Sequence, residues 1–474
     1  MSIKPSIVWF RRDLRLEDQP ALMAAMRKGG PVIPLFIWAP EEEGEWAPGA
    51  ASRWWLHYSL ASLQKELSSL GLSLVIRQHL SLQVILDLIK QTGADSVFWT
   101  RRYEPLIVQR DASIKAELQK QGIKAMSFNG SLLFEPWTVA NKQSHPFQVF
   151  TPFWKKCLSL GEPEPPLERP CAALAYAEKI DSDSLEDLSL LPKIRWDAGL
   201  EEMWCPGSKG ARAHLVNGLE HIIGHYMDMR DRPDLKGTTE LSPYLHFGEI
   251  SPRVIWQGVR QKFGYEHPGA QAYLRQLGWR EFAYHLLYHF PRTPSFPLKE
   301  AFMSFAWNRP GPALKAWQKG QTGYPIIDAG MRQLWKTGWM HNRVRMIAAS
   351  FLVKDLLIPW QEGAAWFWNT LVDADLANNT LGWQWVAGCG ADAAPYFRIF
   401  NPVSQGEKFD PLGHYVRKWV PELQWLPDKW IHQPWAAPDE IIRRAGVQLG
   451  IDYPNPIVDH AQAREKALEA YAKL

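Results

Sequence analysis

The stretch from Trp339 to Trp385 concentrates residue types that can carry redox and recognition chemistry. It contains the segments GWMHNRVRM, DADLANN and GWQW, which bring Trp, Arg, Asp and Asn together. The whole chain has 25 Trp among 474 residues, and a buried indole needs both room and a partner for its N–H group. Many of these rings suit an aromatic core, but an indole can also be oxidised and re-reduced, and its face can stack on a base. The segment therefore indicates electron transfer or base recognition in addition to packing.

The segment NRVRM is expected to be helical, and helical spacing gives its residues two separate tasks. Asn342 and Met346 lie four residues apart and share one face with Arg343. Arg345 points elsewhere and can reach an acidic partner, for which the two Asp residues of DADLANN are the candidates. A structural ion pair is the simpler explanation of that contact. On the shared face, Arg343 can meet a DNA phosphate and Met346 can line a cavity wall.

A second candidate site lies in the segment RDRPDLKGTTELSPYLHFGEISP. It combines a glycine turn, three hydroxyl residues (Thr238, Thr239 and Ser242) and backbone amides that we expect to open a helix. Hydroxyls and amides of this kind can hold phosphate oxygens. Capping of the helix by Thr or Ser explains the same cluster equally well.

These groups need a scaffold, and the first part of the chain predicts a parallel β-sheet. Short β-branched or aromatic runs (SIVWF, VIPLFI, LSLVIR, DSVFW and IKAMSF) alternate with amphipathic segments such as Ser52 to Leu70. This alternation is typical of a doubly wound α/β domain with helices on both faces, on which ligands bind beyond the carboxyl ends of strands. Neither a G-x-G-x-x-G nor a G-x-x-x-x-G-K-[ST] motif follows the first strand, which disfavours a dinucleotide or a triphosphate there.

The region from about Gly161 to Pro192 is rich in Pro, Glu, Asp and Ser. This composition is typical of a surface connector without a core of its own. The predicted organisation is therefore a doubly wound parallel-sheet domain (1–132), a long interdomain linker (133–200) and an all-α helical domain (201–474).

Helical periodicity dominates from Trp196 onward. The segment 324–336 is an example, with Pro325 suited to a first helical turn and Gly338 suited to a C-terminal cap. No repeat of solenoid period is present, so we expect a compact helical bundle.

Composition excludes several classes of protein. With 46% hydrophobic residues the chain can bury two cores. We find no signal peptide and no apolar run long enough to cross a bilayer, so we expect a protein of the reducing cytoplasm that does not enter a membrane. The cysteines are not spaced for zinc, an iron–sulfur cluster or a disulfide framework, so we expect no metal. They are Cys157, Cys171, Cys205 and Cys389.

A net charge of +3 is too small to identify a nucleic-acid-binding protein. The distribution of basic residues is more informative, because several pairs fall among aromatic residues in the C-terminal half. A solvated basic face is the simpler explanation of this pattern on its own. The pairs are Arg230 and Arg232, Arg332 and Lys336, Arg343 and Arg345, and Arg398 and Lys408.

A series of segments, taken together and in order, resembles the photolyase and cryptochrome flavoproteins. The segments are IVWFRRDLRLED, KGTTELSPYLHFGEISP, LGWREF, TGYPIIDAGMRQL, TGWMHNRVRM, DADLANN, GWQW and RIFNPVSQGEKFD. The resemblance extends over essentially the whole chain. The segment PEEEGEWAPGAASRWWLHYSL is in addition similar to plant cryptochromes and to the bacterial class III photolyases.

The resemblance implies a U-shaped FAD, active in its reduced form, within the helical domain. Asn379 is expected to face the flavin N5, where plant cryptochromes have Asp, and the amide favours repair over signalling. Three Trp residues fall on the family's electron relay from the flavin to the surface: Trp383, Trp360 and Trp307. The residues expected to hold FAD are Tyr226, Thr238, Thr239, Glu240, Leu241, Ser242, Arg345, Asp373, Ala374, Asp375 and Asn379.

The resemblance also implies light-dependent repair of cyclobutane pyrimidine dimers in UV-damaged DNA, with the dimer flipped into a pocket. Excited reduced FAD would pass an electron to the dimer and recover it after the ring splits. We expect the protein to act as a monomer in the bacterial cytoplasm. The residues expected to contact the DNA or the lesion are Arg230, Gln276, Trp279, Asn342, Arg343, Met346, Trp385 and Gln405.

Two departures from the family pattern leave alternatives open. Many class I photolyases have Glu where Gln276 stands, and Gln here is also found in (6-4) photoproduct photolyases, which carry His residues that the NRVRM segment lacks. The folate-contacting Asn-Glu pair of class I enzymes is replaced by Leu106 and Ile107, so the antenna chromophore is methenyltetrahydrofolate at another place, a deazaflavin, or absent. A cryptochrome-like photoreceptor and a (6-4) photolyase are the alternative functions.

Overall fold

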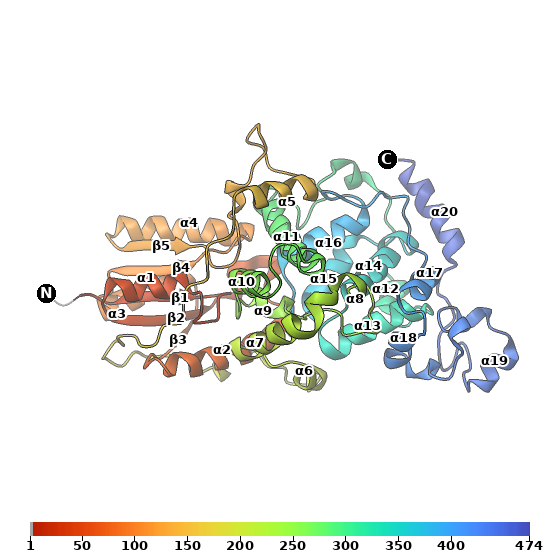
Figure 1. Ribbon diagram of the computed structural model, residues 1–474, viewed down its shortest axis with the longest axis horizontal. Helices are drawn as coiled ribbons and strands as arrows, with labels where there is room; N and C mark the ends of the chain where they lie inside the picture. Colours follow the sequence, from red (N-terminus) through yellow and green to blue (C-terminus); the bar gives the residue numbers. More distant parts are fainter. Residues whose placement is uncertain (1–2) are drawn as a thin grey trace. The chain divides into compact units, whose positions relative to one another are not determined.

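The computed structural model describes residues 3–474, which form two compact units (Figure 1). The domain boundaries drawn above from composition stay a prediction. The first unit comprises the chain up to Asp197 with Glu201–Gly224 and Thr239–Pro291, and the second comprises Ala198–Leu200, His225–Thr238 and Arg292–Leu474.

A five-stranded parallel sheet forms the centre of the first unit, in the order β3-β2-β1-β4-β5. All five predicted strands are confirmed. Every residue of β1 is buried, as expected for a parallel strand covered on both faces. The strands are β1 (Ser6–Phe10), β2 (Val32–Trp38), β3 (Val75–Gln78), β4 (Ser96–Thr100) and β5 (Lys124–Phe128).

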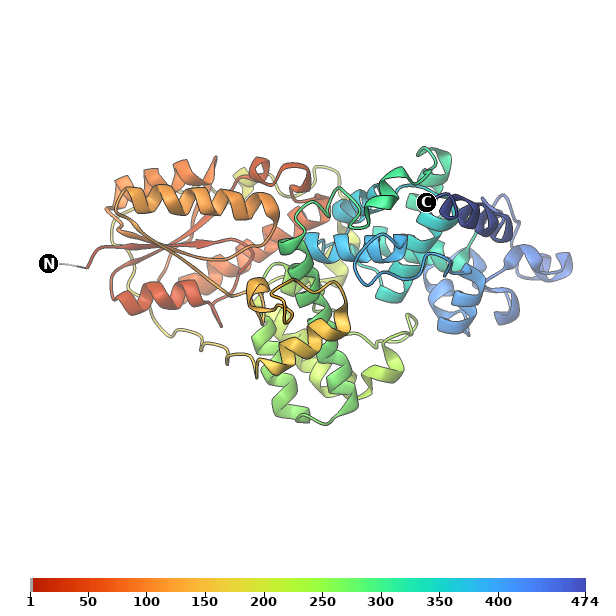
Figure 2. The same ribbon diagram turned by 90° about the horizontal axis from the view of Figure 1, so that it is seen from above.

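Helices cover both faces of this sheet, as predicted (Figure 2). Gly29 ends α1 with φ of 84°, a left-handed conformation that favours glycine. The elements around the sheet are α1 (Pro20–Lys28), η1 (Pro40–Trp46), α2 (Ala50–Ser68), α3 (Ser81–Thr92) and α4 (Pro105–Lys120). The further elements wholly within this unit are η2 (Pro136–Thr138), α5 (Phe150–Ser159), η3 (Glu186–Leu188), α7 (Ser208–Asn217), η4 (Gly218–Ile222), α9 (Ser242–His246), α10 (Pro252–Phe263) and α11 (Pro268–His289).

The predicted connector is mostly exposed, but it is bonded to the sheet. The N–H of Val32 in β2 donates to the carbonyl of Leu174 at 2.8 Å, and the N–H of Ile76 in β3 donates to the hydroxyl of Ser182 at 2.9 Å. Leu185 and Leu188 are buried at its end. The connector therefore belongs to the first unit, and these long-range contacts are not visible in its composition.

The second unit is helical. The predicted helix 324–336 is confirmed as α13 (Pro325–Thr337), with Pro325 in the first turn and Gly338 (φ 66°) at the C-cap. The other helices are α8 (Tyr226–Met229), α12 (Pro312–Lys319), α14 (Asn342–Ser350), α15 (Trp360–Thr370), α16 (Leu376–Ala387), α17 (Pro402–Phe409), α18 (His414–Trp419), α19 (Asp439–Arg444) and α20 (His460–Tyr471).

Shorter helical segments join these elements. The π-helical segment η7 (Phe351–Asp355) continues α14 directly, and π-helical turns are frequent near functional sites. Two elements, η5 (Ile223–His225) and α6 (Ala198–Met203), lie where the chain passes from one unit to the other. The remaining segments are η6 (Glu300–Ser304), η8 (Pro421–Leu423), η9 (Asp428–Trp430) and η10 (Pro434–Ala436). No helix within residues 3–474 is both long and apolar enough to span a membrane.

Candidate functional site

Arg345 and Asp373 form the central ion pair of the second unit. Arg345 Nη2 donates to Asp373 Oδ2 at 2.9 Å, and Arg345 Nε donates to the carbonyl of Met340 at 2.7 Å. The prediction that Arg345 reaches an acid of DADLANN is therefore confirmed, with Asp373 as the partner. The Asp373 side chain is only 5% exposed, so this charged, hydrogen-bonded pair is held largely out of water and presents fixed polar groups.

The helix α14 that carries Arg345 begins with a histidine cap. His341 Nδ1 accepts from the N–H of Arg343 at 3.2 Å. Burial lowers the pKa of His341 to about 4, so the ring is neutral at physiological pH and its nitrogen can accept a hydrogen bond. Asn342 and Met346 share one face of the helix as predicted, with Asn342 Nδ2 donating to Met346 Sδ at 3.8 Å.

The helix α16 begins within the DADLANN segment and is capped by Asp375. Asp375 Oδ1 accepts from the N–H of Asn378 at 2.9 Å and from its Nδ2 at 2.7 Å, which fixes the start of the helix. Asn379, one residue further, donates from Nδ2 to the carbonyl of Ala364 in α15 at 3.1 Å. This bond fixes the orientation of the amide, and Oδ1 of Asn379 is the side-chain atom that can accept a hydrogen bond from a ligand. Ala374, between the two aspartates, is buried.

The segment TTELS adopts a backbone suited to an anion. Glu240 has a left-handed φ of 53°, and Leu241 follows in the right-handed helical region at the N-cap of α9. Neighbouring left- and right-handed residues turn successive N–H groups into one concavity, a nest that binds anions. The N-cap residue of α9 is Leu241, which forms no side-chain cap hydrogen bond. Ser242 opens the helix and is exposed.

The other residues predicted to hold FAD in this region, Thr238, Thr239 and Tyr226, differ in how far their side chains are exposed. The Thr239 hydroxyl is buried and hydrogen-bonded to the hydroxyl of Tyr273 at 3.0 Å, while Thr238 is half-buried. Tyr226 is buried beneath the guanidinium of Arg230, whose central carbon lies 5.4 Å from the ring centre. Burial raises the pKa of the Tyr226 phenol.

The three predicted relay indoles are placed by neighbouring segments of the second unit. Trp383 in α16 lies against α15, where a Cβ at Gly363 would come within 2.0 Å of its ring. Trp360 is the first residue of α15 and is 2% exposed. Just before it, the carbonyl of Leu357 accepts from the N–H of Asn308 at 2.7 Å, which places the half-buried Trp307 next to the segment that leads into α15.

Two arginines predicted to meet DNA share one carboxylate. Arg343 Nη2 donates to Asp231 Oδ1 at 2.7 Å, and its guanidinium lies 4.4 Å from the ring centre of Phe409. Arg230 Nε lies 3.8 Å from the same oxygen. Asp231 thus holds both cations on one side of the second unit and offsets one of their charges.

The other predicted lesion contacts are half-buried side chains. Trp279, in α11 of the first unit, stacks on Phe150 with ring centres 3.9 Å apart and planes 6° from parallel. Gln276 donates from Nε2 to the carbonyl of Ala272 in the same helix at 3.2 Å. Trp385 lies in α16 and Gln405 in α17, both in the second unit.

Sequence reasoning missed three positioning residues. Asp231 and Phe409 hold Arg343, and Gln384 anchors α16 by donating from Nε2 to the carbonyls of Thr293 and Phe296 at 2.7 and 2.9 Å. Asp231 lies between Arg230 and Arg232 in the chain, and an acid between arginines is a signal for such a pair. Nothing in the local sequence identifies Phe409 as the stacking partner.

A separate hollow opens in the first unit. Its lining includes residues that follow the carboxyl ends of three neighbouring strands. Arg11 follows β1, Ala39 follows β2, and Arg102 lies in the loop after β4. The strand order reverses between β1 and β4. Ligands of doubly wound sheets bind beyond the carboxyl ends of the strands at such a point. The lining consists of Trp9, Arg11, Arg12, Phe36, Ile37, Trp38, Ala39, Glu43, Pro48, Ser52, Leu56, Arg102, Arg110, His246 and Phe247.

Charges in this hollow are mutually paired. Arg12 contacts Glu43 and Glu104 at 3.1 and 3.0 Å, and Arg102 contacts the same two carboxylates at 2.7 and 2.9 Å. Burial alone would raise the pKa of Glu104, but Arg102 and then Arg12 lower it to about 2. The guanidinium of Arg110 lies 4.9 Å from the ring centre of Trp9. The hollow thus combines aromatic surface with balanced charge.

Two family models match the chain. Residues 6–171 match the model described as DNA photolyase, and residues 273–473 match the FAD binding domain of DNA photolyase. The family expected from the sequence is therefore confirmed.

Individual proteins extend this match over the whole chain. The deoxyribodipyrimidine photo-lyase of Agrobacterium fabrum is 47% identical over 476 residues, covering 100% of this chain and 99% of the relative. Cryptochrome-2 of Arabidopsis thaliana is 43% identical, covering 99% of this chain and 79% of that protein. The crystal structure of a bacterial class III photolyase from Agrobacterium tumefaciens superimposes with a TM-score of 0.97 at 46% identity, covering 100% of this chain and 98% of the other.

Proposed function

The chain belongs to the DNA photolyase family, and on that premise we propose how its residues perform light-dependent repair of cyclobutane pyrimidine dimers in DNA. The observation that carries the proposal is the fixed amide of Asn379, whose Nδ2 is bonded to Ala364 and whose Oδ1 can accept an N–H. FAD in its reduced form, when bound, supplies the electron that opens the dimer under light and regains it afterwards. An amide acceptor at Asn379 suits a flavin that stays reduced and protonated at N5.

The residues present fit FAD. The nest at Glu240 and Leu241 suits phosphate oxygens because its N–H groups converge. The Arg345–Asp373 pair and the capped Asp375 offer directional donors and acceptors held by their own hydrogen bonds. We therefore assign FAD binding to the positions expected from the sequence, with Tyr226 and Thr238–Ser242 in addition to these residues and Asn379.

We assign reactivation of the cofactor to the three indoles of the second unit. Trp307 is half-buried, Trp360 is buried, and Trp383 packs on α15. Electrons enter at Trp307 and pass through Trp360 and Trp383. The close fit between Trp383 and the backbone at Gly363 restricts the movement of the indole, and a fixed separation between rings is what electron transfer along a chain of side chains needs.

DNA recognition is assigned to the face that carries the arginine pair. Arg343 and Arg230 neutralise phosphates and are kept oriented by Asp231 when no DNA is present. Asn342 and Met346 lie on the same helix and contact the lesion together with Gln276 and Gln405. The indoles of Trp279 and Trp385 stack on the flipped dimer, which costs less to extrude than an intact pair because it is already poorly stacked.

The hollow of the first unit is assigned to an antenna chromophore. Its balanced ion pairs do not favour a highly charged ligand such as a triphosphate, whereas the half-buried Trp38 offers surface for a planar aromatic one. Methenyltetrahydrofolate and a deazaflavin are both planar and aromatic. Reconstitution with each chromophore in wild type and in Trp38→Ala, read by energy transfer to FAD, tests the assignment and identifies the ligand.

The lesion assignment is tested by exchanging the lesion in one repair assay. Reduced protein is illuminated with oligonucleotides that contain either a cyclobutane thymine dimer or a (6-4) photoproduct, with dark controls. Repair of the cyclobutane substrate alone supports the proposal. Repair of the (6-4) substrate alone contradicts it, and the Gln276→Glu variant then shows whether that side chain sets the preference.

A further inference from the structure

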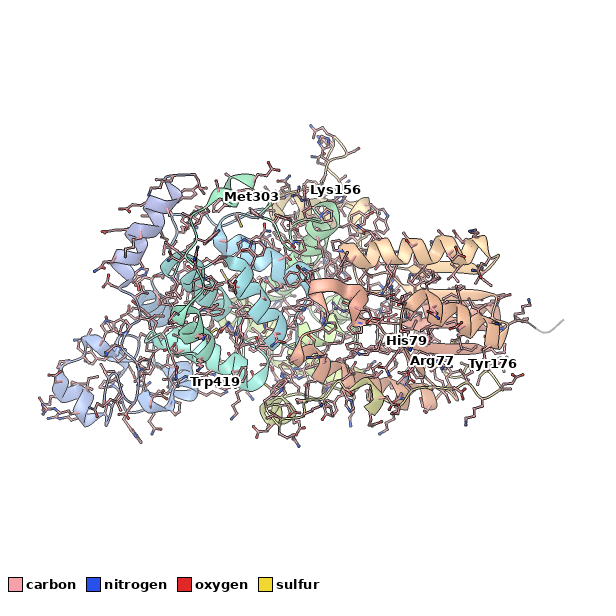
Figure 3. The ribbon with its side chains drawn as sticks, turned by 180° about the vertical axis from the view of Figure 1, so that it is seen from behind. Arg77, His79, Lys156, Tyr176, Met303 and Trp419 are labelled. Atoms are coloured by element: carbon pink, nitrogen blue, oxygen red, sulfur yellow. The ribbon has the colours of Figure 1, made fainter. Side chains whose placement is uncertain are left out.

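An aromatic stack in the first unit fixes the predicted lesion contact Trp279. Helix α5, on which Figure 3 labels Lys156, packs on α11 within this unit. Trp279 of α11 lies on the ring of Phe150 of α5, with ring centres 3.9 Å apart and planes 6° from parallel. Phe282 lies 5.9 Å from both ring centres, with its plane turned by 75° and 74°, so it stands beside the stacked pair. Phe150 therefore covers one face of the indole, and the opposite face is the one that a base can stack on.

Phe150 is itself held in place by buried neighbours. Its side chain is fully buried, and Trp154, one turn further along α5, lies 13° from parallel to it with ring centres 6.4 Å apart. Trp154 packs closely on α11, since a Cβ at Gly278 would come within 2.6 Å of its ring. The plane of the Trp279 indole is thus set by buried rings before DNA binds, which reduces the cost of ordering it on binding.

A cation lies on the same buried ring. The central guanidinium carbon of Arg275 is 4.6 Å from the centre of the Phe150 ring, and a guanidinium stacks favourably on an aromatic face. Arg275 precedes Trp279 by four residues in α11, so the two side chains share one face of the helix, about 6 Å apart along its axis. Gln276, another predicted lesion contact, is the next residue. Arg275 therefore lies one helical turn from the indole that is assigned to the flipped dimer.

Arg275 differs from the other arginines of α10 and α11 because it has no acidic partner. Within residues 3–474 it forms no ion pair and no side-chain hydrogen bond, and it is exposed. No acidic residue stands three or four positions from it on either side. The other three arginines lie 2.8, 3.4 and 3.6 Å from a carboxylate oxygen: Arg253, Arg260 and Arg280. The charge of Arg275 is thus uncompensated, and its N–H groups can bind an anion.

We propose that Arg275 binds a backbone phosphate of the damaged strand when the dimer is stacked on Trp279, and that Phe150 orients both side chains. The inference rests on the lesion contact assigned to Trp279 under Proposed function. A guanidinium that is stacked by its face keeps its N–H groups in the ring plane, where they match two oxygens of a phosphate.

This contact depends on the lesion. In intact DNA the bases stay stacked in the duplex, so no nucleotide is drawn onto Trp279 and no phosphate is brought to Arg275. Arg275 therefore strengthens the binding of damaged DNA alone, whereas Arg343 neutralises phosphates of damaged and intact DNA alike.

The test measures binding in the dark by full-length protein loaded with FAD, over a series of salt concentrations. One DNA duplex contains a cyclobutane thymine dimer and the other is intact. Arg275→Gln should bind the dimer duplex several-fold more weakly and with a salt slope smaller by about 1, while it binds the intact duplex like wild type. Arg53→Gln is the matched control and should change neither affinity. Arg53 is an exposed arginine of α2 in the same unit, without an ion pair in the described part of the chain.

Arg275→Lys separates the charge from the stacked guanidinium. We expect this variant to keep the wild-type salt slope but to bind the dimer duplex more weakly than wild type, because an ammonium group neither lies flat on Phe150 nor donates to two phosphate oxygens in a fixed geometry. Wild-type affinity of Arg275→Lys for the dimer duplex would contradict the role given to Phe150.

Three further results would overturn the inference. Equal weakening of both duplexes in Arg275→Gln would make Arg275 a general attraction for DNA and remove its dependence on the lesion. Unchanged dimer binding in Arg275→Gln, with weakened binding in Arg343→Gln and Trp279→Ala, would show that Arg275 meets no phosphate and would leave the assigned DNA contacts intact. Unchanged dimer binding in all three variants would refute the assigned DNA contacts and the inference together.

Discussion

The substitution Gly363→Ala tests whether α15 holds the innermost relay indole in place. A Cβ at this position would stand 2.0 Å from Cη2 of Trp383 and 2.5 Å from Cζ2 and Cζ3. Since Cβ atoms essentially never approach closer than 3.0 Å, the indole must move by about 1 Å or more. Overpacking of this kind lowers the free energy of unfolding by about 1–3 kcal/mol, whereas replacing a helical glycine by alanine raises it by about 1 kcal/mol. The net destabilisation is therefore about 0–2 kcal/mol, which leaves the protein folded with a displaced Trp383.

Gly382→Ala is the matched control, because Gly382 is exposed on α16 and its Cβ would meet nothing within 4 Å. We expect this control to gain about 1 kcal/mol of helix stability and to photoreduce FAD at the wild-type rate. Gly363→Ala should melt at or below the wild-type temperature and photoreduce FAD several-fold more slowly under blue light. A Gly363→Ala protein that photoreduces normally and is stabilised like the control would refute the contact between Trp383 and α15.

Three further predictions follow from other sites. Trp360→Phe should block photoreduction of oxidised FAD but leave repair by chemically reduced protein nearly unchanged. Normal photoreduction by this variant would contradict the assignment of Trp360 to the relay. Arg343→Gln should weaken binding to damaged and undamaged DNA alike and reduce the salt dependence of binding by a slope of about 1, and an unchanged slope in a salt titration would show that Arg343 meets no phosphate. Glu249, in the first unit, is buried and accepts a hydrogen bond from the N–H of Gly207 at 2.7 Å. Burial raises the pKa of Glu249 to about 8, so the folded state binds its proton more tightly than the unfolded state does. Its stabilising effect should be complete below about pH 4 and be lost at about 1.4 kcal/mol per pH unit as the pH rises from there to about 8. Melting temperatures should therefore fall from pH 5 to 8 in wild type relative to Glu249→Gln and fall no further above pH 8, and parallel curves would contradict the shift.

The elements that could be predicted are those whose cause is local. The strands of the sheet are short buried runs of β-branched and aromatic residues, and α13 carries its own start and stop signals in Pro325 and Gly338. The shared face of Asn342 and Met346 follows from helical spacing alone. Each of these features depends on residues within a few positions of one another.

The features that could not be predicted depend on contacts between distant segments. Asp231 is more than 100 residues away from Arg343 in the chain, and no local pattern pairs them. The anion nest at Glu240 depends on a left-handed φ that its sequence does not favour, and the sequence supported a helix cap by Thr or Ser equally well. The same holds for the hollow of the first unit, where Arg12 and Arg102 meet shared glutamates from separate loops.

The central claim is that this chain repairs DNA and does not act as a light sensor. The claim needs a direct test because both photolyases and cryptochromes match the chain closely. The most direct measurement is the yield of restored thymines when chemically reduced protein is illuminated with a defined cyclobutane dimer oligonucleotide, compared with an identical sample kept dark. The assignment of Asn379, the arginine pair and the indoles to one repair site predicts many turnovers in the light and none in the dark. Tight binding of the damaged strand with no restoration of thymines in the light would contradict it and would make the protein a photoreceptor.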